Sequence, residues 1–404
     1  MGLIVQKFGG SSVKNAQRIR NVAGIIAETY LQGNDVIVVL SAQGDTTDDL
    51  IAKAEEINPK PSKREMDMLL STGEQISCAL CAMAIETMGL PVVSLTGWQA
   101  GFQTNSSYSS ARIKKINAER VQSELDRSHS IVIVTGFQGI NKYGDQTTLG
   151  RGGSDTTAVA LAVALKAALC QIYTDVDGVY TADPRKVPNA RKLKEITYDE
   201  MLDLATLGAG VLHNRSVEMA KKYGVPLVVR SSLNNSEGTV VKEEVTVERM
   251  LISGVALDTD AVRIAVLGLR DVPGVAFKVF DTLAKKNINV DVILQSIGRA
   301  GTKDISFTVN KDDLDDAVAT LEESQERLGF KELHSERNIA KLSIVGSGML
   351  SNPGVAAKMF ESLYNEGVNI NMISTSEIRI TVLINEKDGI RAMNAVHDAF
   401  GLAD

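Results

Sequence analysis

The chain has 404 residues, of which 44% are hydrophobic, so it is long enough for two or three domains with ordinary cores. A net charge of -7 and an aromatic content of 4% argue against nucleic acid as the main partner, because the chain lacks both bulk positive charge and stacking side chains. The three cysteines, Cys78, Cys81 and Cys170, exclude a disulfide framework, and with four scattered histidines we expect small buried thiols and no metal site.

The first predicted element is a short apolar strand at Leu3–Val5, followed by the glycine-rich loop Lys7-Phe8-Gly9-Gly10-Ser11-Ser12. We expect this loop to run straight into an amphipathic helix, Asn15–Tyr30. A helix N-terminus presents unpaired N–H groups and partial positive charge, and glycines let the backbone close on an anion. The loop therefore predicts a phosphate site beside the ammonium group of Lys7. The alternative for Lys7 is a solvated lysine at a strand end.

Up to about Val241, short apolar runs alternate with amphipathic segments, such as the one at Lys63–Met88. The runs are nearly continuous in hydrophobic residues, which is typical of parallel strands covered on both faces. This pattern predicts an α/β fold, an open and mainly parallel αβα sandwich over residues 1–245, with ligands at the carboxyl ends of the strands. The later predicted strands are Val36–Leu40, Pro91–Leu95, Ile131–Thr135, Gln171–Thr174 and Pro226–Arg230.

A second glycine-rich loop, Gly150-Arg151-Gly152-Gly153-Ser154-Asp155, opens an alanine- and valine-rich helix that we expect to begin near Thr156. Arg151 can bind a carboxylate through two hydrogen bonds, and Glu74 can accept an ammonium group, so together they suit an amino acid. Both could instead be surface charges or an internal ion pair, and Ser154 and Asp155 could be a helix cap and a first-turn acid. We expect the two loops to converge on one cleft with room for a polyphosphate and a small acidic metabolite.

The start of the chain predicts no secretory leader, because it opens directly on a strand and a glycine-rich loop. The longest apolar helix that we expect, around Ala158–Leu169, carries Lys166 and is too short to span a bilayer. We therefore expect a cytoplasmic protein without a membrane partner.

A charged stretch, Lys242–Arg249, reads as a linker and is followed by an internal repeat. Ile264–Ser296 matches Ile344–Ser376 at a constant offset of 80 residues, without gaps, and both copies contain the sequence Pro-Gly-Val-Ala. Each copy reads as strand, helix, strand, strand and helix, with a final strand possible. This order predicts two βαββαβ domains, which we place at residues 263–337 and 342–404.

Four motifs occur in the order that is found in the aspartate kinases, and the chain resembles that family. They are the two glycine-rich loops, Ser71-Thr72-Gly73-Glu74, and Tyr173-Thr174-Asp175-Val176-Asp177-Gly178-Val179-Tyr180. The tandem repeat resembles the ACT domains of the same family. The resemblance implies an amino-acid kinase fold and an ATP-dependent phosphorylation of the β-carboxylate of L-aspartate, with Mg²⁺, at the entry to lysine, threonine and methionine biosynthesis. The remaining alternatives are a kinase of glutamate, N-acetylglutamate or a nucleotide, and a catalytically silent amino acid sensor.

The resemblance also implies roles for individual residues. It makes Lys7 and Asp155 catalytic, and it assigns Thr47, Glu74 and Arg151 to aspartate. Ser41 lies at the end of the predicted strand Val36–Leu40, where we expect its hydroxyl group to face the substrate. A carboxylate acceptor with a pKa of about 4 is already ionised at neutral pH, so no general base is needed. The implied ATP-binding residues are Lys7, Phe8, Gly9, Gly10, Ser41, Ser154, Thr174, Asp175, Tyr180, Asp183 and Arg185. The chain departs from the family pattern at Ser11 (commonly threonine), Gly210 (often lysine) and Asn214 (often proline).

By the same resemblance, the ACT pair is expected to bind end-product amino acids, lysine and/or threonine, between the units of two chains. The assembly would be a homodimer through these domains, or an α2β2 complex whose separate regulatory subunit starts at an internal methionine such as Met250. Taken alone, Asn and Asp at strand edges are usually turn formers. The implied effector residues are Asp271, Gly274, Val275, Asp291, Gln295, Asn369, Asn371 and Ile373.

Overall fold

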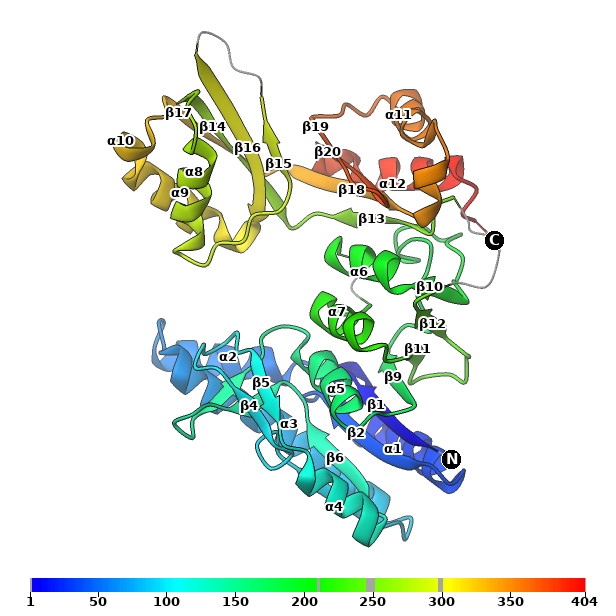
Figure 1. Cartoon of the computed structure of the whole chain (residues 1–404). Helices are drawn as coiled ribbons and strands as arrows, with labels where there is room; N and C mark the ends of the chain where they lie inside the picture. Colours follow the sequence, from blue (N-terminus) through cyan, green and yellow to red (C-terminus); the bar gives the residue numbers. More distant parts are fainter. Residues whose placement is uncertain (1, 209–210, 245–250, 297–300, 404) are drawn as a thin grey trace. The chain divides into compact units, whose positions relative to one another are not determined.

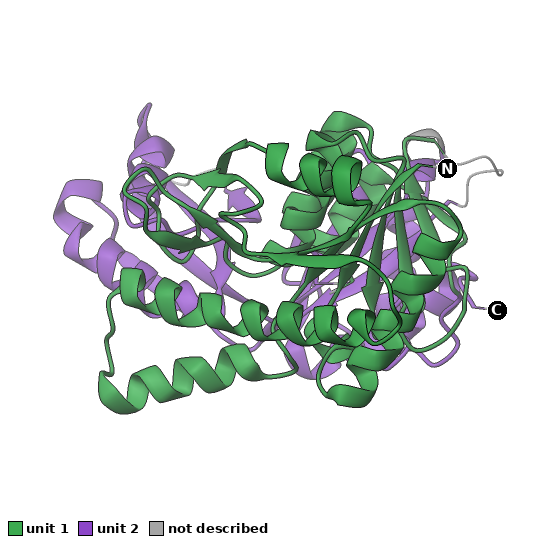
Figure 2. Ribbon diagram, turned by 90° about the horizontal axis from the view of Figure 1, so that it is seen from below, with its two compact units in different colours: residues 1–179, 192–206, 210–247 green, residues 180–191, 207–209, 248–404 purple. Residues whose placement is uncertain are grey.

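A computed structural model describes residues 2–208, 211–244, 251–296 and 301–403 (Figure 1). These residues form two compact units, coloured separately in Figure 2. The first unit holds residues 2–179, 192–206 and 211–244, and the second holds the rest. The segment 180–191 thus belongs to the second unit, although it lies inside the range predicted for the catalytic domain.

An eight-stranded sheet forms the centre of the first unit, with the order β10-β12-β11-β9-β1-β2-β6-β3. Neighbouring strands are parallel from β11 to β3, while β12 pairs with β11 in the antiparallel direction, so the predicted mainly parallel sheet is confirmed. The strands are β1 (Leu3–Phe8), β2 (Asp35–Leu40), β3 (Val92–Leu95), β6 (Ile131–Thr135), β9 (Leu169–Thr174), β10 (Glu195–Thr197), β11 (Leu227–Ser231) and β12 (Thr239–Lys242).

Helices cover both faces of this sheet (Figure 2). Val36, Val38 and Leu40 of β2 share one core with α1 (Ala16–Leu31) and α3 (Lys63–Glu86). Because successive side chains of a strand point to opposite faces, the buried Ile37 and Val39 face the other side, where α5 (Gly153–Ala164) contacts β1, β2 and β9. The remaining helices of the unit are α2 (Thr46–Ile57), α4 (Glu119–Ser128), α6 (Tyr198–Thr206) and α7 (Asn214–Tyr223).

Helix α3 is longer than the apolar helix that we expected to be the longest. Among the described residues it is the one helix with the length and composition to cross a membrane. In this fold it is a core helix, since Cys78, Cys81 and Ile85 are buried against α1 and the sheet. Burial raises the pKa of the Cys81 thiol to about 12, as expected for an inert core cysteine.

A second, smaller sheet was not predicted. Its strands are β4 (Phe102–Thr104), β5 (Ile113–Ile116), β7 (Gln138–Ile140) and β8 (Gln146–Thr148), in the order β5-β4-β7-β8. Three of the four strands have three residues, and β8 is entirely polar, so no apolar run marks them in the sequence. This sheet matters for the site because β8 ends two residues before Gly150.

The start of the first glycine-rich loop differs from the prediction. Strand β1 continues through Phe8, which puts Lys7 inside the strand, and a 3₁₀ turn (Gly10–Ser12) follows. Helix α1 begins only at Ala16, where the side chain of Asn15 caps it by accepting the N–H of Arg18 at 3.0 Å. The second loop does open directly on a helix, but α5 begins at Gly153, so Ser154 and Asp155 lie in its first turn.

The second unit contains two antiparallel four-stranded sheets. The first has the order β15-β16-β14-β17, and the second has the order β13-β18-β20-β19. The first is built from β14 (Ala261–Arg270), α8 (Val275–Ala284), β15 (Ile293–Gln295), β16 (Thr302–Asn310), α9 (Leu314–Glu323), α10 (Gln325–Leu328) and β17 (Glu332–Glu336). The second is built from β13 (Gly254–Asp258), β18 (Ile339–Val345), α11 (Val355–Asn365), β19 (Met372–Thr375), β20 (Arg379–Asn385) and α12 (Gly389–Ala399).

The internal repeat is confirmed at the level of the backbone. Gly274 and Gly354 precede α8 and α11 with φ of 87° and 94°, a left-handed conformation that favours glycine at both equivalent positions. Strand β13 lies outside both predicted domain ranges, yet it pairs with β18 and completes the second sheet. Lys242 of the predicted linker ends β12, while residues 245–250, including Met250, lie outside the described residues.

Candidate active site

A pocket of about 430 Å³ in the first unit is lined by both glycine-rich loops. Lys7, Gly9 and Gly10 come from the first loop, and residues 150–155 come from the second. The predicted convergence of the two loops on one cleft is therefore confirmed. The topology explains it. Strand β1 leads into the first loop, and α5 runs from the second loop back to β9, a parallel neighbour of β1, so the N-terminus of α5 lies at the edge where β1 ends. The other lining residues are Ser41, Ala42, Gly44, Thr47, Asp48, Ile51, Leu70, Glu74, Ser109, Phe137 and Thr148.

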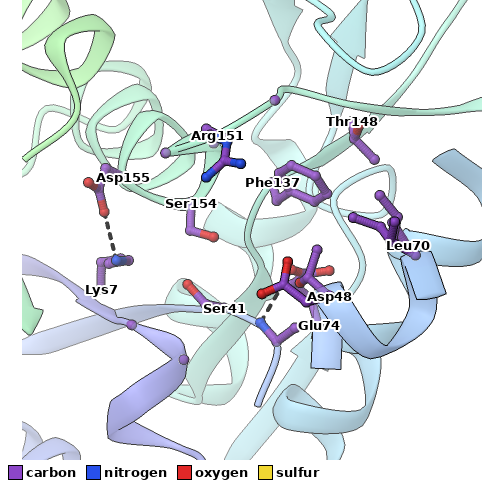
Figure 3. A pocket seen from close by; sticks show the side chains of 18 of the residues that line it. Lys7, Ser41, Asp48, Leu70, Glu74, Phe137, Thr148, Arg151, Ser154 and Asp155 are labelled. Carbon is purple, nitrogen blue, oxygen red and sulfur yellow. Dashed lines mark hydrogen bonds and ion pairs between the residues drawn. The ribbon is translucent and has the colours of Figure 1, made fainter. Parts of the chain in front are cut away.

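At one end of the pocket lies a buried ion pair between Lys7 and Asp155 (Figure 3). Lys7 Nζ is 2.7 Å from Asp155 Oδ1, and the two side chains are 12% and 10% exposed. The other oxygen of Asp155 accepts the backbone N–H of His213 at 3.3 Å. Asp155 therefore holds the ammonium group of Lys7 in place from the first turn of α5.

The glycines of the first loop keep the space around this pair open. A Cβ on Gly9 would lie 3.5 Å from Lys7 Nζ, and a Cβ on Gly10 would lie 2.7 Å from the carbonyl oxygen of Ala42. The second distance is shorter than real Cβ contacts, so the loop requires glycine at position 10. A phosphate group can approach backbone and ammonium here because no side chain occupies the space.

Glu74 stands on α3 at a different part of the pocket (Figure 3). Its Oε1 accepts the N–H of Ala42 at 3.2 Å, and its buried Oε2 has no partner with hydrogen-bond geometry among the described residues. Burial raises the pKa of Glu74 to about 7, against the opposing effect of the Ala42 N–H. A Cβ on Gly73 would lie 2.8 Å from the Cβ of Ala42, so the glycine before Glu74 lets α3 approach the segment that follows β2.

Arg151 is exposed on the second loop and lines the same pocket. Figure 3 shows its side chain near those of Ser154 and Phe137, which line the same pocket. Within the described ranges it makes no ion pair, so Arg151 and Glu74 are not partners of each other. A pocket with a buried carboxylate at one point and an unpaired guanidinium group at another can bind a zwitterionic amino acid by its two charged groups.

Some of the other residues that were predicted to bind substrate or nucleotide line this pocket, and some do not. Ser41, Thr47 and Ser154 line the pocket with Lys7 and Glu74. Phe8 does not, because its ring is fully buried and stacks on Tyr173 with 4.5 Å between ring centroids. Thr174 ends β9, where its hydroxyl donates to Asp175 at 2.9 Å. Neither Thr174 nor Asp175 lines the pocket.

Tyr180, Asp183 and Arg185, which were predicted to contact the nucleotide, lie in the segment 180–191 of the second unit. This segment is held by strand β13 of the second sheet of its unit, because Val255 N–H donates to the carbonyl oxygen of Thr181 at 2.7 Å. The hydroxyl of Thr181 also lies 2.9 Å from Nε2 of the buried His397. Asp183 accepts two hydrogen bonds from the Arg185 guanidinium group, at 3.0 and 3.1 Å.

Several pocket residues were not predicted. Asp48 lies in the first turn of α2, and Phe137 follows β6 with a left-handed φ of 71° that nothing in its identity suggests. Ser109 also has a positive φ, of 65°, and Thr148 ends the unpredicted strand β8. The signal that could have found them is their place next to a predicted loop or strand end.

The predicted effector residues lie in the second unit. Asp271 pairs with Lys303 at 2.8 Å, and Asp291 pairs with the buried Lys341 of β18 at 2.6 Å. Asn369 donates to Asn371 at 3.3 Å. Gln295 and Ile373 are exposed on the edge strands β15 and β19, whereas Val275 is buried beside Gly274 at the start of α8.

Comparisons with known proteins agree with this architecture. The family model of the amino acid kinase family matches residues 2–231, and the family model of the ACT domain matches residues 264–325 and 342–400. An aspartokinase of Bacillus sp. (strain MGA3) is 53% identical over 404 residues, which cover 100% of this chain and 98% of that protein. Aspartokinase 2 of Bacillus subtilis (strain 168) is 50% identical over 404 residues, with the same coverage.

A solved structure of E. coli aspartokinase III in complex with aspartate and ADP covers 98% of this chain and 99% of that chain, with a TM-score of 0.84 and 26% identity. The aspartate kinase of Synechocystis is 46% identical and covers 98% of this chain and 69% of that chain, with a TM-score of 0.55. The chain therefore belongs to the aspartokinases, members of the amino acid kinase family that carry ACT domains and phosphorylate the β-carboxylate of L-aspartate with ATP.

Proposed function

We propose that the pocket of the first unit binds the phosphates of ATP at the Lys7 loop and L-aspartate between Glu74 and Arg151. Glu74 accepts the α-ammonium group, Arg151 binds a carboxylate, and Ser41 and Thr47 contribute hydroxyl groups from the same lining. The observation that carries this assignment is that one pocket of about 430 Å³ holds a buried carboxylate, the Lys7–Asp155 pair and a guanidinium group that forms no ion pair with any described residue. The structure of E. coli aspartokinase III in complex with aspartate and ADP supports it.

In the proposed reaction an oxygen of the substrate β-carboxylate attacks the γ-phosphorus of ATP, and the bond from that phosphorus to the oxygen of the ADP leaving group breaks. The products are 4-phospho-L-aspartate and ADP. No proton has to be removed, because the β-carboxylate is ionised at neutral pH. Catalysis then rests on alignment and on positive charge that offsets the charge of the transferring phosphoryl group. Lys7 supplies that charge, and Asp155 fixes its position.

Mg²⁺ is part of this proposal as the partner of ATP. Mg²⁺ keeps several waters and is usually held by one or two carboxylates together with substrate phosphates, where it neutralises phosphate charge. The donor set fits, because the carboxylate of Asp155 lines the pocket beside the proposed phosphate site. The nucleotide roles of Tyr180, Asp183 and Arg185 stay predictions.

The substrate is tested by a coupled ADP-release assay with L-aspartate, L-glutamate and N-acetyl-L-glutamate. We expect kcat/KM to be about 10- to 200-fold higher for aspartate than for glutamate, because one additional methylene moves the accepting carboxylate away from the nucleotide. Equal or higher kcat/KM with glutamate would contradict the assignment. Absence of turnover with every acceptor would favour the silent sensor.

Regulation and assembly extend the proposal to the second unit. We infer that lysine, threonine or both bind the ACT domains, in a cytoplasmic homodimer or α2β2 complex. The lysine complex of E. coli aspartokinase III supports an effector of this class. An effector acts only if it binds two arrangements of the protein with different affinity.

Effector binding is expected to raise the melting temperature of the full chain by a few degrees at about 100 times its Kd. The variant Asp291→Asn is expected to lose this shift, because Asp291 is a predicted effector residue. Asp281→Asn serves as the control, since Asp281 pairs only with its helix neighbour Lys285 at 2.7 Å among the described residues. An unchanged shift in Asp291→Asn would remove this residue from the effector site, and no shift in the native chain with either amino acid would end the regulatory proposal.

A further inference from the structure

Asp67 is a fully buried acid on α3 with 0% exposure, two helical turns before Glu74. Its carboxylate accepts the N–H of Ser109 at 2.9 Å, the N–H of Thr148 at 2.9 Å and the hydroxyl of Thr148 at 2.7 Å. Within the described residues it forms no ion pair, so these hydrogen bonds alone compensate its burial. A buried carboxylate without a counter-charge is costly, which calls for a reason beyond packing.

The donors to Asp67 come from two segments that lie beside the turn at residues 149–152, which bears Arg151. Thr148 lies three residues before Arg151, and Ser109 holds a left-handed conformation with φ of 65°. The two segments also bond each other, because Ala111 N–H donates to the carbonyl oxygen of Thr148 at 2.8 Å. A Cβ on Gly150 would lie 3.1 Å from the carbonyl oxygen of Ser109, so the turn packs tightly on this segment.

Arg215 of α7 holds the same turn through different atoms. Its guanidinium group donates to the carbonyl oxygen of Leu149 at 2.6 Å and to that of Ala111 at 3.2 Å. Two side chains therefore anchor the residues from Thr148 to Gly150. The carboxylate of Asp67 accepts N–H and hydroxyl donors, and the guanidinium group of Arg215 donates to carbonyl oxygens. Such a turn has little freedom to move the residue that follows it.

We propose that Asp67 is a positioning residue for aspartate binding, which sets the separation between Glu74 and Arg151. Residues seven apart on a helix share a face and lie about 10 Å apart along its axis. Helix α3 thus carries Glu74 directly into the pocket and, through Asp67 and Thr148, fixes the turn that bears Arg151. This inference depends on the proposed roles of Glu74 and Arg151 in binding substrate.

The test compares steady-state kinetics of Asp67→Asn and Thr148→Val with those of the native enzyme. Asp67→Asn replaces one acceptor oxygen by an NH₂ group that faces N–H donors, and Thr148→Val removes only the hydroxyl bond. A displacement of about 1 Å can cost about 100-fold in a positioned site, so we expect KM for aspartate to rise at least tenfold in Asp67→Asn and less in Thr148→Val. KM for ATP is expected to change less than twofold in both.

Thr147→Val is the matched control for a lost buried hydrogen bond. Its hydroxyl lies 2.6 Å from that of Thr104, away from Asp67 and from the pocket lining, one residue from Thr148 on the same strand. We expect it to lower the melting temperature but leave KM for aspartate unchanged. A rise in KM for aspartate in Thr147→Val equal to that in Thr148→Val would show that loss of stability explains both, and would overturn the inference.

A double-mutant cycle separates this inference from the proposed function on which it depends. If Asp67 acts through Arg151, adding Asp67→Asn to Arg151→Ala raises KM for aspartate by less than twofold further. Should the two effects multiply, or should KM for ATP rise as much as KM for aspartate, Asp67 only supports the fold. Should Arg151→Ala alone leave KM for aspartate unchanged, the proposed substrate site is wrong and the inference falls with it. If Asp67→Asn does not fold, the same double-mutant cycle is measured with Thr148→Val and Arg151→Ala.

Discussion

Replacing Lys7 by methionine is expected to lower kcat by about 100- to 1,000-fold, with less than a threefold change in KM for aspartate. The loss has this size because a preorganised positive group that stabilises transition-state charge typically contributes that factor. KM for aspartate is spared because Glu74 and Arg151, which bind it in our proposal, lie on other elements. The measurement is ADP release by the native and variant enzymes at saturating ATP.

The control for this variant addresses the charge that it leaves behind. Removing one partner of a buried ion pair costs about 3–5 kcal/mol, and Asp155 would lose its partner at 2.7 Å. We therefore expect Lys7→Met to melt at a lower temperature than the native chain and the double variant Lys7→Met/Asp155→Asn to regain much of that temperature. Neither variant is expected to regain kcat. Recovery of kcat together with the melting temperature would show that Lys7 has a structural role only.

KM for aspartate is expected to rise about tenfold for each pH unit below 7. Burial raises the pKa of Glu74 to about 7, so the empty pocket holds a proton there at lower pH, and this proton has to leave before an ammonium group is bound. Aspartate itself keeps its charges between about pH 5.5 and 7, the range of this prediction. Glu74→Gln is expected to have a high KM with no such slope. A KM that is independent of pH in the native enzyme would contradict the role of Glu74.

The raised pKa of Glu74 also predicts that the protein loses stability as pH rises, although its affinity for aspartate increases over the same range. The folded protein holds the Glu74 proton more tightly than the unfolded chain, so this residue lowers the free energy of unfolding as pH rises from about 4.5 to about 7. Glu74→Gln lacks the buried charge and is expected to melt at a higher temperature than the native chain at pH 8, with a smaller difference at pH 5. Thermal denaturation at the two pH values measures this, and equal differences at both would show that Glu74 is not buried as a charge.

Much of this fold follows from local patterns in the sequence. Continuous apolar runs predict the central parallel strands. A helix that leads into a parallel strand begins at the carboxyl edge of the sheet, so the Gly150–Asp155 loop, which opens such a helix, could be predicted to meet the Lys7 loop. The constant offset of 80 residues predicts two copies of one domain, since each copy repeats the glycine that starts its first helix.

What the sequence could not show depends on contacts between distant residues. Asp67 reads as one more polar residue of an amphipathic helix, and only the fold brings it to Ser109 and Thr148. The two ACT sheets also differ in the strand that pairs with the first strand of each repeat. In the first sheet this strand is β17, which comes after the repeat in the chain. In the second sheet it is β13, which comes before both repeats and has no copy in the first one. The segment 180–191 follows a predicted strand of the kinase domain, yet its backbone bonds to β13.

The central claim is that Arg151 and the Lys7 loop bind different ligands in one pocket. Isothermal titration calorimetry of the native chain and Arg151→Ala, with L-aspartate and separately with Mg·ADP, tests it most directly. Hydrogen bonds between charged groups contribute about 1.5–3 kcal/mol, so the account predicts that Arg151→Ala weakens aspartate binding by at least tenfold and changes the Kd of ADP by less than twofold. Unchanged aspartate binding, or an equal loss of affinity for ADP, would contradict it.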